Sequence, residues 1–112
     1  MEHQDCIFCK IIAGQILAEK IKETPDLIVI KDISPQAPIH YLIVPKKHIK
    51  NLQSVSDLDQ ELLGSILLMA KELSVDLSNP QEFRLISNNG ASVGQSVFHI
   101  HFHFLAGKQF SE

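Results

Sequence analysis

Three histidines alternate with apolar residues near the end of the chain. Successive side chains of a β-strand point to opposite faces. A strand over residues 97–105 would therefore carry His99, His101 and His103 on one face. Its other face would be the buried one, formed by Phe98, Ile100, Phe102 and Phe104. Packing does not require three imidazoles in a row, and imidazole serves as nucleophile, base or metal ligand near neutral pH. The pattern therefore indicates a functional strand.

The spacing of the three histidines favours two separate sub-sites. At about 3.3 Å per residue, His99 and His103 lie roughly 13 Å apart at their Cα atoms, whereas neighbouring pairs lie about 6.6 Å apart. Neighbouring imidazoles can cooperate, but the whole row cannot easily converge on one point. A single three-histidine metal centre is therefore disfavoured.

The polar loop before this strand suits an anion. Gly90 and Gly94 permit backbone turns that expose N–H groups, and such turns bind phosphates. Gln95 and Ser96 add an amide and a hydroxyl. A plain hairpin loop is the alternative interpretation of this segment.

The two cysteines, Cys6 and Cys9, form a single CxxC motif. In a reducing compartment this motif indicates metal binding or redox chemistry before a structural disulfide.

One long helix should support these residues. Ser56 is a suitable N-cap, and Asp57, Asp59 and Glu61 place negative charge at the positive end of the helix dipole. The expected core-facing side recurs at helical spacing and consists of Leu58, Leu62, Leu63, Ile66, Leu67, Met69, Ala70 and Leu73. We interpret this face as packing rather than as a cofactor site.

The remaining pattern predicts a short helix and several strands. The helix covers residues 7–13 and ends at Gly14. Strands are expected over residues 27–30, 39–44 and 83–87, in addition to 97–105. Residues 16–23 are polar and weakly patterned, and receive no assignment.

The bulk composition predicts one folded domain over residues 1–112. Hydrophobic residues make up 45% of the chain and charged residues 21%, as in folded soluble proteins. The net charge of -3 gives no general attraction for nucleic acid or an anionic membrane. The start of the chain resembles no signal peptide and no apolar stretch is long enough to span a bilayer, so a cytoplasmic location is expected.

Residues 99–105 follow the order histidine, apolar, histidine, apolar, histidine, apolar, apolar, and in this the chain resembles the histidine triad (HIT) superfamily. Other segments resemble its Hint branch, the purine nucleoside phosphoramidases: residues 6–12, 32–40, 45–49, Asn88 and 94–97. The resemblance implies an α+β fold, a five-stranded antiparallel sheet with one long and one short helix. It also implies a homodimer whose two sheets join into ten strands.

The same resemblance implies hydrolysis of a nucleoside phosphoramidate. His101 would attack the α-phosphorus, expel an amine and form a nucleotidyl-histidine, from which water releases AMP. His103 would bind phosphate oxygens, His40 would hold the ring of His101, and Ser96 would lie near the leaving group. Gln95, the Val97 backbone amide and Asn88 would line the phosphate region.

For the nucleoside, the resemblance implies that Asp32 accepts hydrogen bonds from the ribose hydroxyls. The purine slot would be apolar and consist of Ile7, Phe8, Ile11, Ile30 and Ile33. For these five residues, simple core packing is an equally good interpretation.

Some bacterial members of the family carry a zinc ion at positions that resemble Cys6, Cys9, His48 and His99. Four protein ligands leave no open position for water, so such a zinc would be structural and would leave His101 and His103 for catalysis. No organic cofactor is expected. Two reduced cysteines without a metal are the alternative.

Three other functions remain open from the sequence. The first is a metallohydrolase in which the histidines bind a catalytic metal, although few carboxylates lie near them in sequence. The second is a nucleotide-binding or partner-binding module with incidental hydrolysis. The third is a dinucleoside polyphosphate hydrolase. Only residues 106–112 follow the last expected strand, which is shorter than the tail of many relatives, and this leaves leaving-group preference open.

Overall fold

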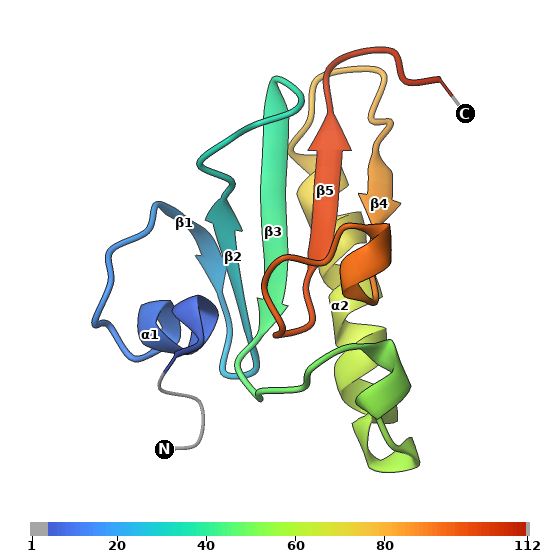
Figure 1. The fold of residues 1–112 in the computed structure, drawn as a ribbon. Coiled ribbons are helices and arrows are strands. Elements are labelled where there is room, and N and C mark those ends of the chain that lie inside the picture. Colours follow the sequence, from blue (N-terminus) through green and yellow to red (C-terminus); the bar gives the residue numbers. More distant parts are fainter. Residues whose placement is uncertain (1–4, 112) are drawn as a thin grey trace.

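The computed structural model of the chain describes residues 5–111; residues 1–4, on which the expectation of no signal peptide partly rests, lie outside them. The described chain forms one antiparallel sheet with the order β1-β2-β3-β5-β4 (Figure 1). Its strands are β1 (Lys20–Glu23), β2 (Leu27–Lys31), β3 (Ile39–Pro45), β4 (Arg84–Ile86) and β5 (Phe102–Ala106). The five-stranded antiparallel sheet with a long and a short helix is as expected.

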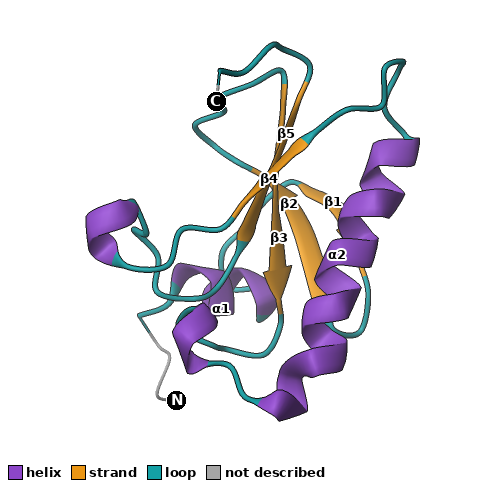
Figure 2. Cartoon of the chain, turned by 90° about the vertical axis from the view of Figure 1, so that its right-hand side faces the viewer, coloured by secondary structure: helices purple, strands orange, loops and turns teal. Residues whose placement is uncertain are grey.

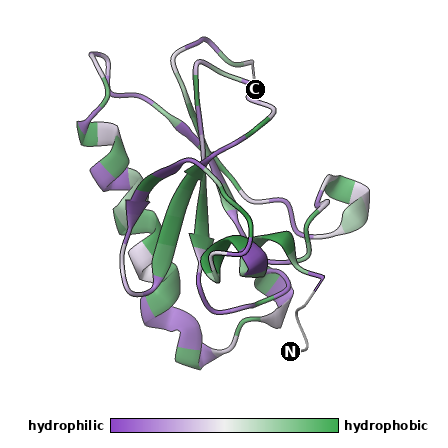
Figure 3. Cartoon of the chain, turned by 90° about the vertical axis from the view of Figure 1, so that its left-hand side faces the viewer, coloured by the Kyte–Doolittle hydropathy of each residue, from purple (hydrophilic) through white to green (hydrophobic). Residues whose placement is uncertain are grey.

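The two helices cover opposite faces of the sheet (Figure 2). The long helix α2 (Gln60–Val75) packs on one face, where its core residues meet Val29, Ile43 and Phe104. The short helix α1 (Ile7–Ile12) lies against the other face, over β2 and β3. The central strands accordingly form the most continuously apolar part of the ribbon (Figure 3). Most of this second face beyond α1 is left for the histidines.

The start of α2 follows the expected capping pattern, with one correction. Ser56 and Asp59 form a reciprocal capping box, but residues Asp57–Asp59 make a 3-10 turn before the α-helix begins at Gln60. Leu58 sits on that turn and is 92% exposed, and Leu67 is 59% exposed on the outer side of α2. Both were expected in the core, which the helix instead forms with Ile66, Met69, Ala70 and Leu73.

Strand β1 was not expected from the sequence. Its residues Lys20–Glu23 are charged at three of four positions, and none of them is fully buried. An edge strand pairs on one side only, so backbone hydrogen bonds to β2 suffice to define it without an apolar pattern.

The last strand is shorter than expected, because β5 begins at Phe102 rather than at Val97. The final β3–β5 pair joins Ile43 to Phe102. Just beyond it, β3 ends at Pro45, which lacks a backbone N–H and cannot extend the ladder. Residues 97–101 therefore run irregularly, held by a hydrogen bond of 2.6 Å from the amide of Ile100 to the carbonyl of Ile49. Phe98, expected to be buried, is 46% exposed.

Within the part of the chain that the structure describes, no helix has the length and apolar character needed to cross a membrane.

Candidate active site and metal centre

Strand register gathers polar side chains on the sheet face opposite α2. Leu42 pairs with His103, and His40 pairs with Leu105. Directly paired residues of an antiparallel ladder share a face, so His40 and His103 project on the same side. The face continues onto β4, where Arg84 and Ile86 pair with Leu105 and His103. The histidines thus lie between β2 on one side and β4 on the other.

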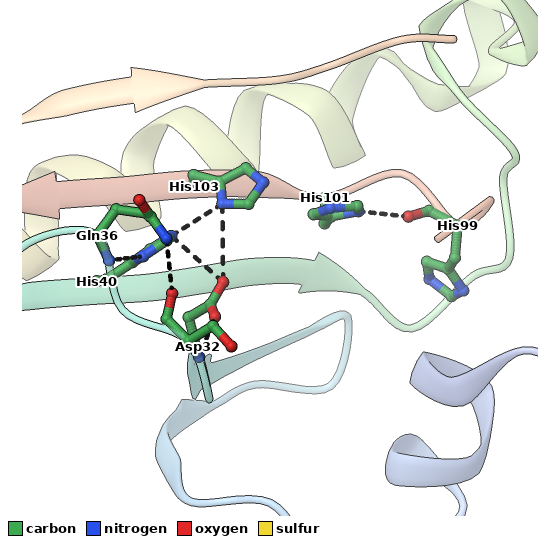
Figure 4. Close-up of polar contacts among 7 residues, drawn as sticks. Asp32, Gln36, His40, His99, His101 and His103 are labelled. Carbon is green, nitrogen blue, oxygen red and sulfur yellow. Dashed lines mark hydrogen bonds and ion pairs between the residues drawn. The ribbon is translucent and has the colours of Figure 1, made fainter. Parts of the chain in front are cut away.

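The ring of His101 is held in a defined tautomer. Its Nδ1 lies 2.7 Å from the carbonyl oxygen of His99 (Figure 4). A carbonyl oxygen only accepts, so Nδ1 carries the proton and donates it. The lone pair of the neutral ring is therefore on Nε2. Among residues 5–111 Nε2 has no hydrogen-bond partner, yet every buried side-chain nitrogen or oxygen has one, so Nε2 reaches solvent.

The surroundings of His101 keep the ring uncharged. Burial lowers its pKa from the ordinary value of 6.5, while the hydrogen bond to His99 and the charge of Asp32 act in the opposite direction with smaller effect. Phe8 of α1 packs edge-on against the ring, with centroids 5.0 Å apart. A neutral, solvent-accessible imidazole nitrogen in a fixed ring is a nucleophile available at neutral pH.

A chain of hydrogen bonds also fixes the tautomer of His103. The backbone N–H of Gln36 donates to Nδ1 of His40 at 3.0 Å. Nε2 of neutral His40 must then carry its proton, which it donates to Nδ1 of His103 at 2.9 Å (Figure 4). This leaves the proton of neutral His103 on Nε2. His103 therefore presents an N–H donor next to the lone pair of His101, with ring centroids 5.1 Å apart.

The resemblance implied that His40 holds the ring of His101, but in the structure His40 contacts His103 instead. The register places His40 diagonally opposite His103, whereas His101 lies beyond the last β3–β5 pair. The hydrogen bond from His40 accordingly goes to His103, and the His99 carbonyl orients His101. Gln36 is the residue that sequence reasoning missed here. Its amide acts through the backbone, and no side-chain pattern could have revealed it.

Asp32 joins this group from the end of β2. Its Oδ2 lies 3.4 Å from Nε2 of His40 and 4.0 Å from Nδ1 of His103. Its Oδ1 accepts the backbone N–H of Ser34 at 2.7 Å. The fold thus brings a carboxylate to the histidines, which their sequence distance did not suggest. Asp32, His40 and His103 could hold a metal ion, but the proton on Nε2 of His40 leaves that ring no lone pair toward the group.

The low pKa of His103 predicts acid-sensitive stability. Burial, followed by the neighbouring rings of His101 and His40, lowers this pKa to about 4. Between pH 6.5 and 4 the unfolded chain binds a proton at this residue that the folded chain does not. The free energy of unfolding is therefore unaffected by protonation of this residue above about pH 6.5. It falls as the pH drops toward 4, by at most about 3 kcal/mol in total. Denaturant unfolding near pH 7 and pH 5, with chelator present throughout, should show a smaller pH dependence for His103→Gln than for the native chain. Equal pH dependence in both proteins would contradict the assignment.

A second cluster lies at the other end of the histidine row. The Sγ atom of Cys6 is 3.3 Å from Nδ1 of His99, and the Sγ atom of Cys9 is 3.3 Å from Nδ1 of His48 and 3.6 Å from Nδ1 of His99. All four ligand atoms lie within 4.8 Å of one another and could hold a metal ion. The cluster joins the start of α1 to the segments after β3 and before β5.

This donor set fits zinc. Tetrahedral zinc with Zn–S bonds near 2.3 Å and Zn–N bonds near 2.0 Å separates sulfur and nitrogen ligands by about 3.5 Å. The observed separations of 3.3 to 3.6 Å agree. Nε2 of His99 donates to the carbonyl of Pro45 at 2.7 Å, so the lone pair on Nδ1 faces the cluster, as a metal ligand requires. Without a metal, burial and Cys6 raise the pKa of Cys9 to about 11, which would keep its thiol protonated.

The loop of residues 88–96 only partly matches the expectation of exposed donors. Gly90 and Gly94 adopt positive φ angles of 130° and 105°, as the expected turns require. The side chain of Gln95, however, is buried and accepts from the Gly90 amide while donating to the carbonyls of Lys50 and Val97. The side chain of Gln95 thus stabilises the loop, and its amide has no N–H left to donate to a phosphate. Ser96 is exposed.

The five apolar residues expected at the purine divide into two groups. Phe8, Ile11 and Ile30 are buried in the core between α1 and the sheet, so packing accounts for them. Ile7 and Ile33 are 42% and 94% exposed, and packing within the chain does not account for them.

Three cavities help to place these residues. One, of about 560 Å³, lies between the segment after α2 and the segment after β5, away from the histidines. A cavity of about 370 Å³ holds Ser96 and Val97 together with Ile7, Cys6 and His48. Another of about 370 Å³ holds His40, His103 and Asn88. The expected phosphate-binding residues therefore line two cavities on either side of His101 rather than one.

The fold and the histidine geometry match known proteins. Residues 13–110 match the HIT domain family. An uncharacterized HIT-like protein of Synechocystis is 47% identical over 108 residues, covering 96% of this chain and 95% of that protein. A HIT family hydrolase from Legionella pneumophila superposes with a TM-score of 0.90 at 44% identity, covering 95% of this chain and 96% of that one. A histidine triad protein from Clostridium difficile does so at 0.93 and 37% identity, covering 100% and 98%.

The chain therefore belongs to the HIT domain family, and its fold is that of HIT family hydrolases. The Cys6, Cys9, His48 and His99 cluster could hold a metal ion, and zinc is consistent with it.

Proposed function

We propose that the chain is a nucleotide hydrolase that cleaves the P–N bond of purine nucleoside 5′-phosphoramidates. The observation that carries this proposal is the fixed tautomer of His101, whose Nδ1 proton is held by the His99 carbonyl at 2.7 Å. The lone pair of Nε2 is thereby directed to solvent beside the N–H donor of His103. Nε2 of His101 is suited to attack phosphorus, and the N–H of His103 is suited to donate a hydrogen bond to a phosphate oxygen.

The reaction proceeds in two displacements. In the first, Nε2 of His101 forms a bond to the α-phosphorus, the P–N bond breaks, and the electron pair leaves with the amine, which takes up a proton. In the second, a water oxygen forms a bond to phosphorus, the bond to Nε2 breaks, and AMP is released with loss of the water proton. Dividing one displacement into two lowers each barrier, and the ring returns to its starting state.

The Nε2–H of His103 supports both steps by donating to a phosphate oxygen as its negative charge grows. His40 and Gln36 position that donor through the hydrogen-bond chain. Asn88 lines the same cavity and adds an amide. Ser96 lines the cavity on the other side of His101 and would donate its hydroxyl to the nitrogen of the departing amine, the atom bonded to phosphorus.

The nucleoside would lie on the β2 side of the site. Asp32 would accept the ribose hydroxyls with the oxygen that faces the histidines. Phe8 and Ile30 would form the floor of the purine slot, and the exposed side chains of Ile7 and Ile33 would close it. Covering a base would bury the aliphatic surface that Ile33 and, in part, Ile7 expose.

The Cys6, Cys9, His48 and His99 cluster would hold a structural zinc ion. Bound there, zinc would supply a cross-link between α1 and the sheet. The reaction itself would use only the imidazoles and their neighbours.

We also propose that the chain is a cytoplasmic homodimer. In the described residues β4 is the edge of the sheet and pairs with β5 alone. Addition of the same strand from a second copy would join two sheets into ten strands and cover Phe83, which is 39% exposed beside this edge.

The test is AMP release from adenosine 5′-phosphoramidate, followed by chromatography, with diadenosine tetraphosphate as a competing substrate. Rapid release that persists in excess chelator is the expected result. Preference for the dinucleotide would identify a dinucleoside polyphosphate hydrolase. Loss of the chemical step in chelator, with the fold intact, would indicate a metallohydrolase. Tight nucleotide binding without turnover would indicate a binding module.

A further inference from the structure

A cavity next to His103 carries positive charge that the proposed reaction does not use. It extends from His40 of β3 across β5 to β4 and the segment after β5, and its volume is about 370 Å³. Arg84 and Ile86 of β4 lie on the same sheet face as His103, because they pair with Leu105 and His103. Lys108 and Phe110, from the segment that follows β5, line the wall at the end of the cavity beside Arg84.

The two cations of this wall are available for an anion. No Asp or Glu lines the cavity, and neither Arg84 nor Lys108 forms an ion pair within residues 5–111. The guanidinium of Arg84 is nevertheless held in place. It lies 4.7 Å from the ring of Phe110, and its Nη2 donates to the carbonyl of Ser111 at 2.8 Å. Guanidinium has five N–H donors, so most of them remain for a ligand.

The position of the cavity indicates which part of a substrate reaches it. The nucleoside residues of the proposed function lie on the β2 side of the histidines, and the α-phosphate lies at His101 and His103. The cavity extends from His40 and His103 toward β4, away from β2. A group bonded to the phosphorus and directed away from the nucleoside would enter it. The cavity beside Ser96 differs in charge, since among the described residues Asp5 lines it and no Lys or Arg does.

Resting on the proposed function, we infer that the cavity formed by Arg84, Lys108 and Phe110 binds a negatively charged substituent of the leaving amine. The chemical class is an amine that carries a carboxylate or a phosphate, either of which a guanidinium recognises through paired hydrogen bonds. Conjugates of AMP with such amines would be the preferred substrates of this chain. The specificity-determining residue is Arg84, with Lys108 as an exposed second cation.

The test compares kcat/KM for three AMP phosphoramidates, made with propylamine, β-alanine and phosphoethanolamine. Each contains the same type of scissile P–N bond, and only the last two carry an anionic group on the amine. The native chain should favour at least one anionic conjugate over the neutral one by about 10-fold or more, the size of a charged hydrogen bond. Arg84→Gln should bring this ratio close to one, and Lys108→Gln should lower it by about threefold because an exposed cation contributes less.

Lys71→Gln is the matched control, because Lys71 is an exposed cation on α2, across the sheet from the cavity, and its loss should leave the ratio unchanged. A preference for β-alanine alone or for phosphoethanolamine alone identifies the anion as carboxylate or phosphate. Turnover of the propylamine conjugate without any preference, or with a preference that survives Arg84→Gln, would overturn the inference while leaving the proposed function intact.

If no conjugate is cleaved, the proposed function fails and the cavity is still tested by binding. Calorimetry on the full chain then gives Kd for the same three conjugates. An anionic conjugate should bind about 10-fold more tightly than the neutral one, and Arg84→Gln should remove the difference. Equal Kd values for all three in the native chain would overturn the inference.

Discussion

Replacing His101 by alanine should lower kcat for adenosine 5′-phosphoramidate by four or more orders of magnitude. Removal of a nucleophile in a two-step mechanism has effects of about this size, because no other group provides the same attack. His101 is held by one hydrogen bond and its Nε2 reaches solvent, so alanine should be tolerated by the fold. Steady-state AMP release measures the effect, and a thermal unfolding curve of the variant verifies its fold.

His103→Asn is the informative comparison for this variant. His103 donates a hydrogen bond in the proposed reaction but forms no bond to phosphorus, so its loss should cost only about 10- to 100-fold. The two histidines are neighbours of the same chemical type, with ring centroids 5.1 Å apart. Losses of similar size in both variants would mean that the two rings act as a unit, and would remove the special role assigned to His101.

Removing zinc should destabilise the chain more than any change at the reacting histidines. The native protein should contain one zinc per chain, and its extraction should lower the melting temperature by at least about 10 °C, because structural zinc contributes directly to folding. α1 is a short helix that packs on the sheet through Phe8 and Ile11, and the cluster of Cys6, Cys9, His48 and His99 would cross-link its start to the segments after β3 and before β5. Metal analysis with calorimetry before and after chelation measures both quantities.

The matched variants for zinc are His48→Gln, which removes one ligand, and His103→Gln, which removes an imidazole outside the cluster. Zinc should be lost from the first and retained in the second. If the native protein contains no zinc and chelator does not change its melting temperature, the zinc proposal is wrong. The cysteines would then be two reduced thiols.

Much of the scaffold could be predicted because burial leaves a pattern in the sequence. α2, β2 and β3 all have apolar residues at helical or continuous spacing, and all three were found near their expected positions. β1 has no such apolar pattern, since an edge strand of charged residues is defined by backbone pairing. β5 was expected to begin too early, because alternation continued into residues 97–101 where β3 no longer provides a partner.

The candidate site was predictable in its composition but not in its connections. The spacing of the histidine row correctly separated His99 from the pair His101 and His103, although His99 precedes the strand instead of lying on it. The hydrogen bond from His40 to His103 and the approach of Asp32 depend on strand register, which spacing alone does not give. Gln95 appeared to be a phosphate donor because its amide is polar, and its burial within the loop could be seen only in the fold.

The stereochemical course at the α-phosphorus tests the covalent mechanism most directly. An adenosine 5′-phosphoramidothioate of one phosphorus configuration would be hydrolysed in ¹⁸O-labelled water, and the configuration of the labelled product determined by NMR. Each in-line displacement inverts the phosphorus, so attack by His101 followed by attack by water predicts overall retention. Inversion would show that water attacks the substrate in a single step, and would contradict the nucleotidyl-histidine at His101 even if the chain hydrolyses phosphoramidates rapidly.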